Sequence, residues 1–167
     1  MKILGLAGYS GSGKTTLVVR LLPELRRRGL VVSTLKHTHH SVSVDQAGDA
    51  SRALRDAGAT DVVVATRQMW VLLHEHRDAP EPSLAELAAR MTPVDLLLVE
   101  GFKQRPHEKI EVHRPATGAP LLCTDDPLVI AVASDAPLSG LRPPVLDLDD
   151  IPAIAEFIVE RCQPKPA

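Results

Sequence analysis

The chain has 167 residues, of which 44% are hydrophobic and 24% charged, and its formal net charge is −2 at pH 7. This charge excludes a whole-molecule field that would attract nucleic acid or anionic lipid, and an aromatic content of 2% leaves few rings on which bases stack. We therefore expect no nucleic-acid partner, one domain over residues 1–162 and a frayed tail over residues 163–167.

Neither a membrane span nor an export signal is predicted. No apolar run approaches the roughly 20 residues that a spanning helix needs, and Met1 is followed directly by a strand-like segment rather than a cleavable signal. Cys123 and Cys162 form no C-x-x-C pair, so we expect buried, reduced thiols rather than a zinc site or a disulfide. These features predict a cytoplasmic protein with no membrane partner.

The first elements of the chain predict a phosphate-binding loop. Residues 3–7 are strand-like, residues 8–15 read G-Y-S-G-S-G-K-T, and residues 16–28 carry a helical apolar stripe. The middle stretch fits G-x-x-x-x-G-K-[ST] in the strand–loop–helix context where backbone N–H groups surround a phosphate. Pro23 interrupts the stripe, so we expect a kink or a second helical piece there. The residues expected to bind a nucleoside triphosphate are Ser10, Gly11, Ser12, Gly13, Lys14, Thr15 and Thr16.

The rest of the chain alternates short apolar runs with amphipathic segments, which predicts a parallel sheet covered by helices. Residues 61–66 and 70–74 are typical of an antiparallel hairpin. Single strands are expected at residues 31–35, 96–99, 110–113, 128–133 and 145–148, and helices from about Gln46, from residue 84 after the N-cap Ser83, and after Asp150. The fold class is therefore α/β: a P-loop NTPase with a mostly parallel sheet flanked by helices and extended by the hairpin.

Glu100 is the candidate acidic group beside the phosphate loop. It ends the apolar run at residues 96–99, where the carboxyl end of a core strand delivers side chains to a ligand. We expect Glu100 and the Thr15 hydroxyl to hold Mg²⁺, and Lys14 to reach the β- and γ-phosphates. Asp95 is the alternative acid, but it lies at the other end of the strand. Gly101 follows Glu100, and its N–H is expected to approach a γ-phosphate.

A cluster of basic residues follows the strand at residues 31–35. Its members, at the rim where doubly wound sheets bind ligands, are Lys36, His37, His39 and His40. Three imidazoles this close are compatible with a transition metal, with contact to an anionic ligand or partner, or with an ordinary loop. Asp45 and Asp49 follow, and either is a candidate to orient water or metal, while Asp45 is equally a candidate N-cap.

Two further segments are candidates for the same rim. Residues 102–109 are basic and rich in turn formers, so Lys103 is expected to contact the triphosphate or a second anion, with a solvated loop as the equal alternative. Asp135 follows the strand at residues 128–133 and is a candidate acceptor for guanine N1–H and N2–H. The N-K-x-D signature is absent, so these residues alone leave guanine and adenine both open.

Taken together, these stretches resemble the molybdopterin-guanine dinucleotide biosynthesis protein B (MobB) family. The resemblance rests on five runs in the family's order: S-G-S-G-K-T-T from Ser10, K-H-T-H-H from Lys36, A-G-A at residues 57–59, L-V-E-G-F-K at residues 98–103 and I-A-V-A-S-D ending at Asp135. The family's D-x-x-G-x-D-S stretch is altered, because Asp49 falls one place early, so no family role is carried over to it.

The resemblance implies a GTP-binding, weakly hydrolysing accessory protein of molybdenum cofactor maturation. Such a protein forms a homodimer, binds GTP with Mg²⁺, and assists the molybdenum cofactor guanylyltransferase that attaches GMP to molybdopterin. Molybdopterin binding near the basic rim is also implied. Two other functions stay open from the residues: a small-molecule P-loop kinase with Asp45 or Asp49 as base, and a metal-delivery GTPase that uses the histidine cluster.

Overall fold

The computed structural model describes residues 1–38, 44–46 and 48–162. Its elements in chain order are β1 (Lys2–Ala7), α1 (Lys14–Arg27), β2 (Val32–Lys36), α2 (Ala50–Asp56), β3 (Asp61–Ala65), β4 (Trp70–His74), α3 (Leu84–Ala89), β5 (Leu96–Glu100), β6 (Lys109–His113), the 3₁₀ turn η1 (Pro115–Thr117), β7 (Val129–Ser134), β8 (Val145–Asp147) and α4 (Ile151–Cys162). No helix among these residues is long and apolar enough to cross a membrane.

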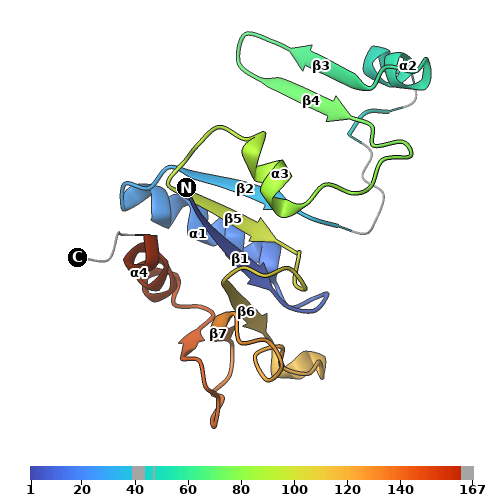
Figure 1. The fold of residues 1–167 in the computed structure, drawn as a ribbon. Helices are drawn as coiled ribbons and strands as arrows, with labels where there is room; N and C mark the ends of the chain where they lie inside the picture. Colours follow the sequence, from blue (N-terminus) through green and yellow to red (C-terminus); the bar gives the residue numbers. More distant parts are fainter. Residues whose placement is uncertain (39–43, 47, 163–167) are drawn as a thin grey trace. The chain divides into compact units, whose positions relative to one another are not determined.

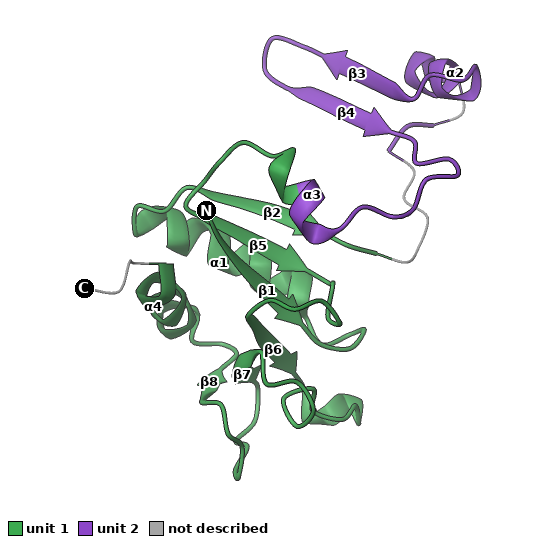
Figure 2. Cartoon of the chain, in the orientation of Figure 1, with its two compact units in different colours: residues 1–38, 88–167 green, residues 39–87 purple. Residues whose placement is uncertain are grey.

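The chain divides into two compact units, shown in separate colours in Figure 2. Unit 1 comprises residues 1–38 and 88–167, and unit 2 comprises residues 39–87. The expected single domain over residues 1–162 stays a prediction.

Unit 1 contains the predicted parallel sheet (Figure 1), with six strands in the order β2-β5-β1-β6-β7-β8. Every neighbouring pair is parallel, so all six strands end at one edge. The phosphate loop follows the central strand β1, and the segments after β2, β5, β6 and β7 begin at the same edge. This topology confirms the predicted α/β class and gathers the candidate residues of unit 1 on one rim.

One face of this sheet packs against α1 and α4. Leu17, Leu21 and Leu25 of α1 recur at helical spacing and are almost completely buried, because they meet apolar side chains of the central strands. The other buried members of this core include Leu4, Leu6, Leu98, Ile110, Ala131, Ile154 and Ile158.

Helix α1 continues through Pro23, so the expected second helical piece is absent from this segment. Proline removes one N–H from the helix and leaves the carbonyl four residues earlier without its usual partner. That carbonyl belongs to Val19, which is 63% exposed. Water can therefore bind the carbonyl on the outer side of the helix, which makes the proline tolerable.

Unit 2 contains the predicted hairpin, β3 and β4, which pair antiparallel and form a sheet of their own. Helix α2 begins at Ala50, so the expected start near Gln46 is wrong. Asp49 occupies the N-cap position, and its carboxylate accepts a hydrogen bond from Gln46 N at 2.8 Å. Asp45 is not the N-cap, because Asp49 directly precedes the helix; the Asp45 carboxylate instead pairs with Arg55 at 2.5 Å.

The predicted N-cap at Ser83 of α3 is present as a capping box. The Ser83 hydroxyl accepts a hydrogen bond from Glu86 N, and the Glu86 carboxylate accepts one from Ser83 N.

Candidate functional site

The phosphate loop has the backbone geometry of an anion cradle. Gly13 adopts a left-handed conformation at the N-cap of α1, where the first N–H groups of a helix have no acceptor within it. Gly8 also has a positive φ, 147°, which residues other than glycine rarely adopt. A Cβ on Gly8 would lie 2.4 Å from the Val112 carbonyl oxygen, so the loop can approach β6 this closely only with glycine there.

The other predicted loop residues surround this turn. Ser10, Gly11, Thr15 and Thr16 are exposed and therefore accessible to a ligand. Ser12 is buried, and its hydroxyl oxygen has no hydrogen-bond partner among the described residues. A buried polar atom without a partner is uncommon in a folded protein, and here it lies within the cradle.

Lys14 folds back over the loop. Its ammonium donates hydrogen bonds to the carbonyl oxygens of Gly8 and Tyr9, at 3.0 and 2.8 Å. Burial lowers the pKa of Lys14, Glu100 raises it, and the positive charges of Lys103 and Lys36 lower it further. Repulsion among three lysine charges in one place favours a polyanionic ligand, because such a ligand would relieve it.

Thr15 and Glu100 meet at the centre of the rim, although they are far apart in the sequence. The Thr15 hydroxyl donates to a Glu100 carboxylate oxygen at 2.7 Å. Lys36, at the end of β2, donates to the same hydroxyl at 3.1 Å and lies 3.3 Å from the carboxylate. The strand register explains this contact, because Glu100 pairs with Lys36 of β2 on one side and with Leu6 of β1 on the other.

These oxygen atoms fit a magnesium ion. Mg²⁺ prefers hard oxygen ligands, and it is commonly held by one or two protein oxygens together with phosphate oxygens and water. The Thr15 hydroxyl and the Glu100 carboxylate supply such a pair beside the cradle. Asp95 lies at the opposite end of β5, where its carboxylate accepts from Val31 N at 2.8 Å. Asp45 is engaged with Arg55 inside unit 2, and its role as a metal ligand stays a prediction.

The segments after β2 and β5 are in close contact. His37 N donates to the Glu100 carbonyl at 2.8 Å, and the His37 and Phe102 rings lie 4.2 Å apart. Gly101 has φ 98°, and a Cβ there would lie 2.8 Å from the His37 carbonyl oxygen. Glycine is therefore required at residue 101 for the two segments to lie this close.

The histidine cluster is only partly described. His39 and His40 lie outside the described residues, whereas Lys36 and His37 belong to unit 1. Among the residues with described positions, no group of three His, Cys, Asp or Glu side chains is arranged to hold a metal ion.

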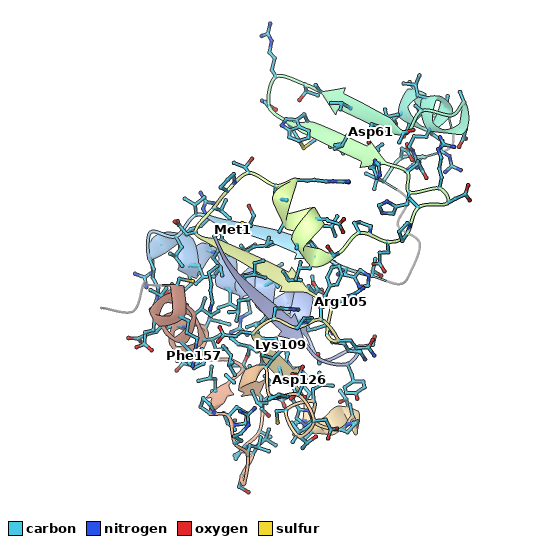
Figure 3. All side chains as sticks on the ribbon, in the orientation of Figure 1. Met1, Asp61, Arg105, Lys109, Asp126 and Phe157 are labelled. Carbon is cyan, nitrogen blue, oxygen red and sulfur yellow. The ribbon has the colours of Figure 1, made fainter. Side chains whose placement is uncertain are left out.

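The basic loop at residues 102–108 contacts both the phosphate loop and β6. Lys103 lies with its ammonium 4.8 Å from the centre of the Tyr9 ring in the phosphate loop. Lys109, which is 1% exposed, donates to the carbonyls of Lys103 and Arg105 and pairs with Asp126 at 2.7 Å. Figure 3 labels Lys109 and Asp126 next to each other.

Asp135, the candidate for base recognition, is paired with a residue that sequence reasoning did not single out. Arg114 donates to the Asp135 carboxylate at 2.5 Å and to the Ser12 carbonyl at 3.2 Å. One signal pointed to Arg114: it directly follows the strand predicted at residues 110–113, at the rim where the other candidates gather.

Comparison with known proteins places this site in a family context. The sequence profile described as "Molybdopterin guanine dinucleotide synthesis protein B" (MobB) matches residues 3–135. The molybdopterin-guanine dinucleotide biosynthesis adapter protein of Escherichia coli strain K12 is 44% identical over 164 residues, which cover 96% of this chain and 93% of that protein. The protein of the same name from Haemophilus influenzae is 45% identical over 159 residues, covering 93% and 86%.

Solved structures agree with the sequence relatives. A crystal structure of molybdopterin-guanine biosynthesis protein B superimposes with a TM-score of 0.74 at 28% identity, covering 95% of this chain and 99% of the other. A MobB homologue from Bacillus stearothermophilus gives 0.70 at 27% identity, covering 97% and 98%. On the match to residues 3–135 and these full-length similarities, the chain belongs to the MobB family.

Proposed function

We propose that this protein is a GTP-binding accessory protein in the biosynthesis of molybdopterin guanine dinucleotide. Membership of the MobB family and similarity to the adapter proteins of Escherichia coli and Haemophilus influenzae support a role in this pathway. The nucleotide assignment rests on one observation. On one rim, beside a cradle of backbone N–H groups, lie the side chains of Lys14, Thr15 and Glu100.

The binding role of each group follows from its chemistry. The loop N–H groups and the Lys14 ammonium bind the β- and γ-phosphates, while Thr15 and Glu100 hold Mg²⁺. The ion would neutralise charge on the phosphate oxygens. Lys14 and the loop N–H groups stabilise negative charge between the β- and γ-phosphates, so the protein acts at most as a slow GTPase that yields GDP and phosphate.

The same proposal includes the partners. The exposed lysines of the rim, Lys36 and Lys103, supply positive charge for a second anionic molecule, which we propose to be molybdopterin. The protein acts as a homodimer with the molybdenum cofactor guanylyltransferase. We assign it to the cytoplasm, where unpaired thiols such as Cys123 and Cys162 persist.

Calorimetric titration with GTP and ATP, each with and without Mg²⁺, tests the proposal. We expect GTP to bind in the presence of Mg²⁺ and the Lys14→Ala variant to lose most of that affinity, because the ammonium that contacts the phosphates is gone. Lys2→Ala is the matched control, since Lys2 pairs with Glu108 away from the cradle. Wild-type protein that binds neither nucleotide would overturn the proposal.

A further inference from the structure

Arg114 connects two parts of the candidate nucleotide site that the sequence keeps far apart. It directly follows β6, and Asp135 directly follows β7. These strands are parallel neighbours in which His113 pairs with Ser134. The side chain of Arg114 therefore lies between the phosphate loop, which follows β1 on one side of β6, and Asp135, which follows β7 on the other.

The contacts of Arg114 reach both sides. Its Nη1 donates to Asp135 Oδ2 at 2.5 Å, and its Nε donates to the Ser12 carbonyl at 3.2 Å. A Cβ built on Gly13 would lie 3.5 Å from Nε and 3.7 Å from Nη2. The guanidinium thus packs on the phosphate loop where α1 begins. A planar guanidinium fixes the direction of its partners better than a lysine ammonium would.

The pair is accessible enough to meet a ligand. The side chains of Arg114 and Asp135 are 35% and 28% exposed, so neither is sealed in the core. The Asp135 carboxylate only accepts hydrogen bonds, and each of its oxygens has more than one acceptor site. One oxygen can therefore remain on Arg114 while the carboxylate still accepts from a ligand.

The chemistry of this pair matches guanine better than adenine. The pairing edge of guanine carries N–H donors at N1 and N2 beside the O6 acceptor, whereas adenine has an acceptor at N1 and an amino donor at C6. A fixed carboxylate accepts both guanine donors and would oppose the adenine N1 lone pair. A site built to accept a particular N–H discriminates strongly against the analogue that lacks it.

We propose that Arg114 is a positioning residue for base recognition: it holds the Asp135 carboxylate at a fixed place relative to the phosphate loop, and so selects a 2-amino-6-oxopurine nucleotide. This inference rests on the proposed function. It makes the phosphate contact and the base contact parts of one connected unit rather than two independent loops.

The test compares GTP with ITP, which lacks only the 2-amino group, and with ATP, by calorimetric titration. For wild-type protein we expect GTP to bind at least about tenfold more tightly than ITP, since a hydrogen bond to a charged group is lost. In Arg114→Met the GTP-to-ITP ratio should fall to about threefold or less, and Arg114→Lys should restore part of it. A role limited to supporting the loop would weaken all three nucleotides equally.

Several controls keep the outcomes distinct. The ratio compares nucleotides on one preparation, so a loss of folded protein cancels. Arg142→Met is the matched control, because Arg142 is bonded to the Pro127 carbonyl in the same unit, and its ratio should equal that of the wild type. Asp135→Asn should favour XTP over GTP, because an amide N–H can donate to the xanthine O2.

Two results would overturn the inference: a wild-type protein without preference for GTP over ITP, or an unchanged ratio in Arg114→Met. In either case the proposed nucleotide binding would stand. Failure of the wild-type protein to bind any of the three nucleotides would instead remove the proposed function itself.

Discussion

Lys36 places its ammonium beside both oxygen atoms that we assign to magnesium. It lies 3.1 Å from the Thr15 hydroxyl and 3.3 Å from the Glu100 carboxylate. An ammonium and a divalent cation compete for the same oxygen lone pairs, so Lys36 must turn away when the ion binds. Its side chain is 57% exposed, which lets it move into solvent or onto a phosphate.

Replacing this lysine should therefore change the magnesium requirement. We predict that Lys36→Met lowers the Mg²⁺ concentration at half-maximal GTP binding by about two- to fivefold, the size expected for an exposed ion pair. Titrating Mg²⁺ at fixed GTP measures this midpoint. Lys2→Met, which removes a lysine that pairs with Glu108 away from the cradle, should leave the midpoint unchanged. An upward shift in Lys36→Met would contradict the prediction.

At the scale of residues, the sequence predicted where functional groups gather but not which of them touch. Glu100 and Lys36 both end apolar strands, and the ends of parallel strands share one edge, so their common rim followed from pattern alone. Their direct contact depends on strand order, because β2 lies next to β5 rather than next to β1. Arg114 was missed for a related reason: its partner Asp135 becomes a neighbour only through the pairing of β6 with β7.

At the scale of elements, β6 departs from what its sequence indicates. The alternation K-I-E-V-H is typical of a strand with one face in water, yet all five residues are buried. The polar face is covered by neighbouring loops that supply partners: Lys109 meets Asp126 and two carbonyls, while Glu111 accepts from the N–H groups of Leu122 and Cys123. The pattern within one strand carries no information on such loops, because the covering residues lie outside the strand, before and after it in the chain.

The buried lysine of β6 should matter for stability and for the rim. We predict that Lys109→Met lowers the free energy of unfolding by about 2–4 kcal/mol, because Asp126 and two loop carbonyls lose their common donor. Urea denaturation measures this change. Lys2→Met breaks the exposed pair with Glu108 and should cost at most about 1 kcal/mol. Equal losses in the two variants would show that the buried pair has no special role.

At the scale of the whole molecule, exposed apolar side chains concentrate on unit 2. Those on α2, the hairpin strands and their turn are Leu54, Val63, Val64, Met69, Trp70 and Leu72. A two-stranded hairpin is at best marginally stable in water by itself, and clustered exposed apolar residues are typical of an interaction surface. Trp70, the single tryptophan of the chain, is 64% exposed.

We therefore predict that the proposed homodimer contact covers the hairpin face that carries Val63, Trp70 and Leu72. Sedimentation velocity should give the mass of two copies for the wild type and a shift towards one copy for Trp70→Gln, because the indole would lose its apolar cover. Val145→Thr, a change at an exposed apolar residue of unit 1, should sediment like the wild type. A Trp70→Gln protein that remains fully dimeric would exclude this surface from the contact.

Because β1 lies in the middle of the sheet, the proposed nucleotide site can form only after later strands have been translated. This strand is translated well before β5 and β6, yet it is hydrogen-bonded between them. Loop closure over such separations is slow, and unpaired strands are prone to misassociate. A nascent chain that stops before Lys109 lacks β6, whose Val112 carbonyl lies against Gly8, so we expect it not to bind nucleotide.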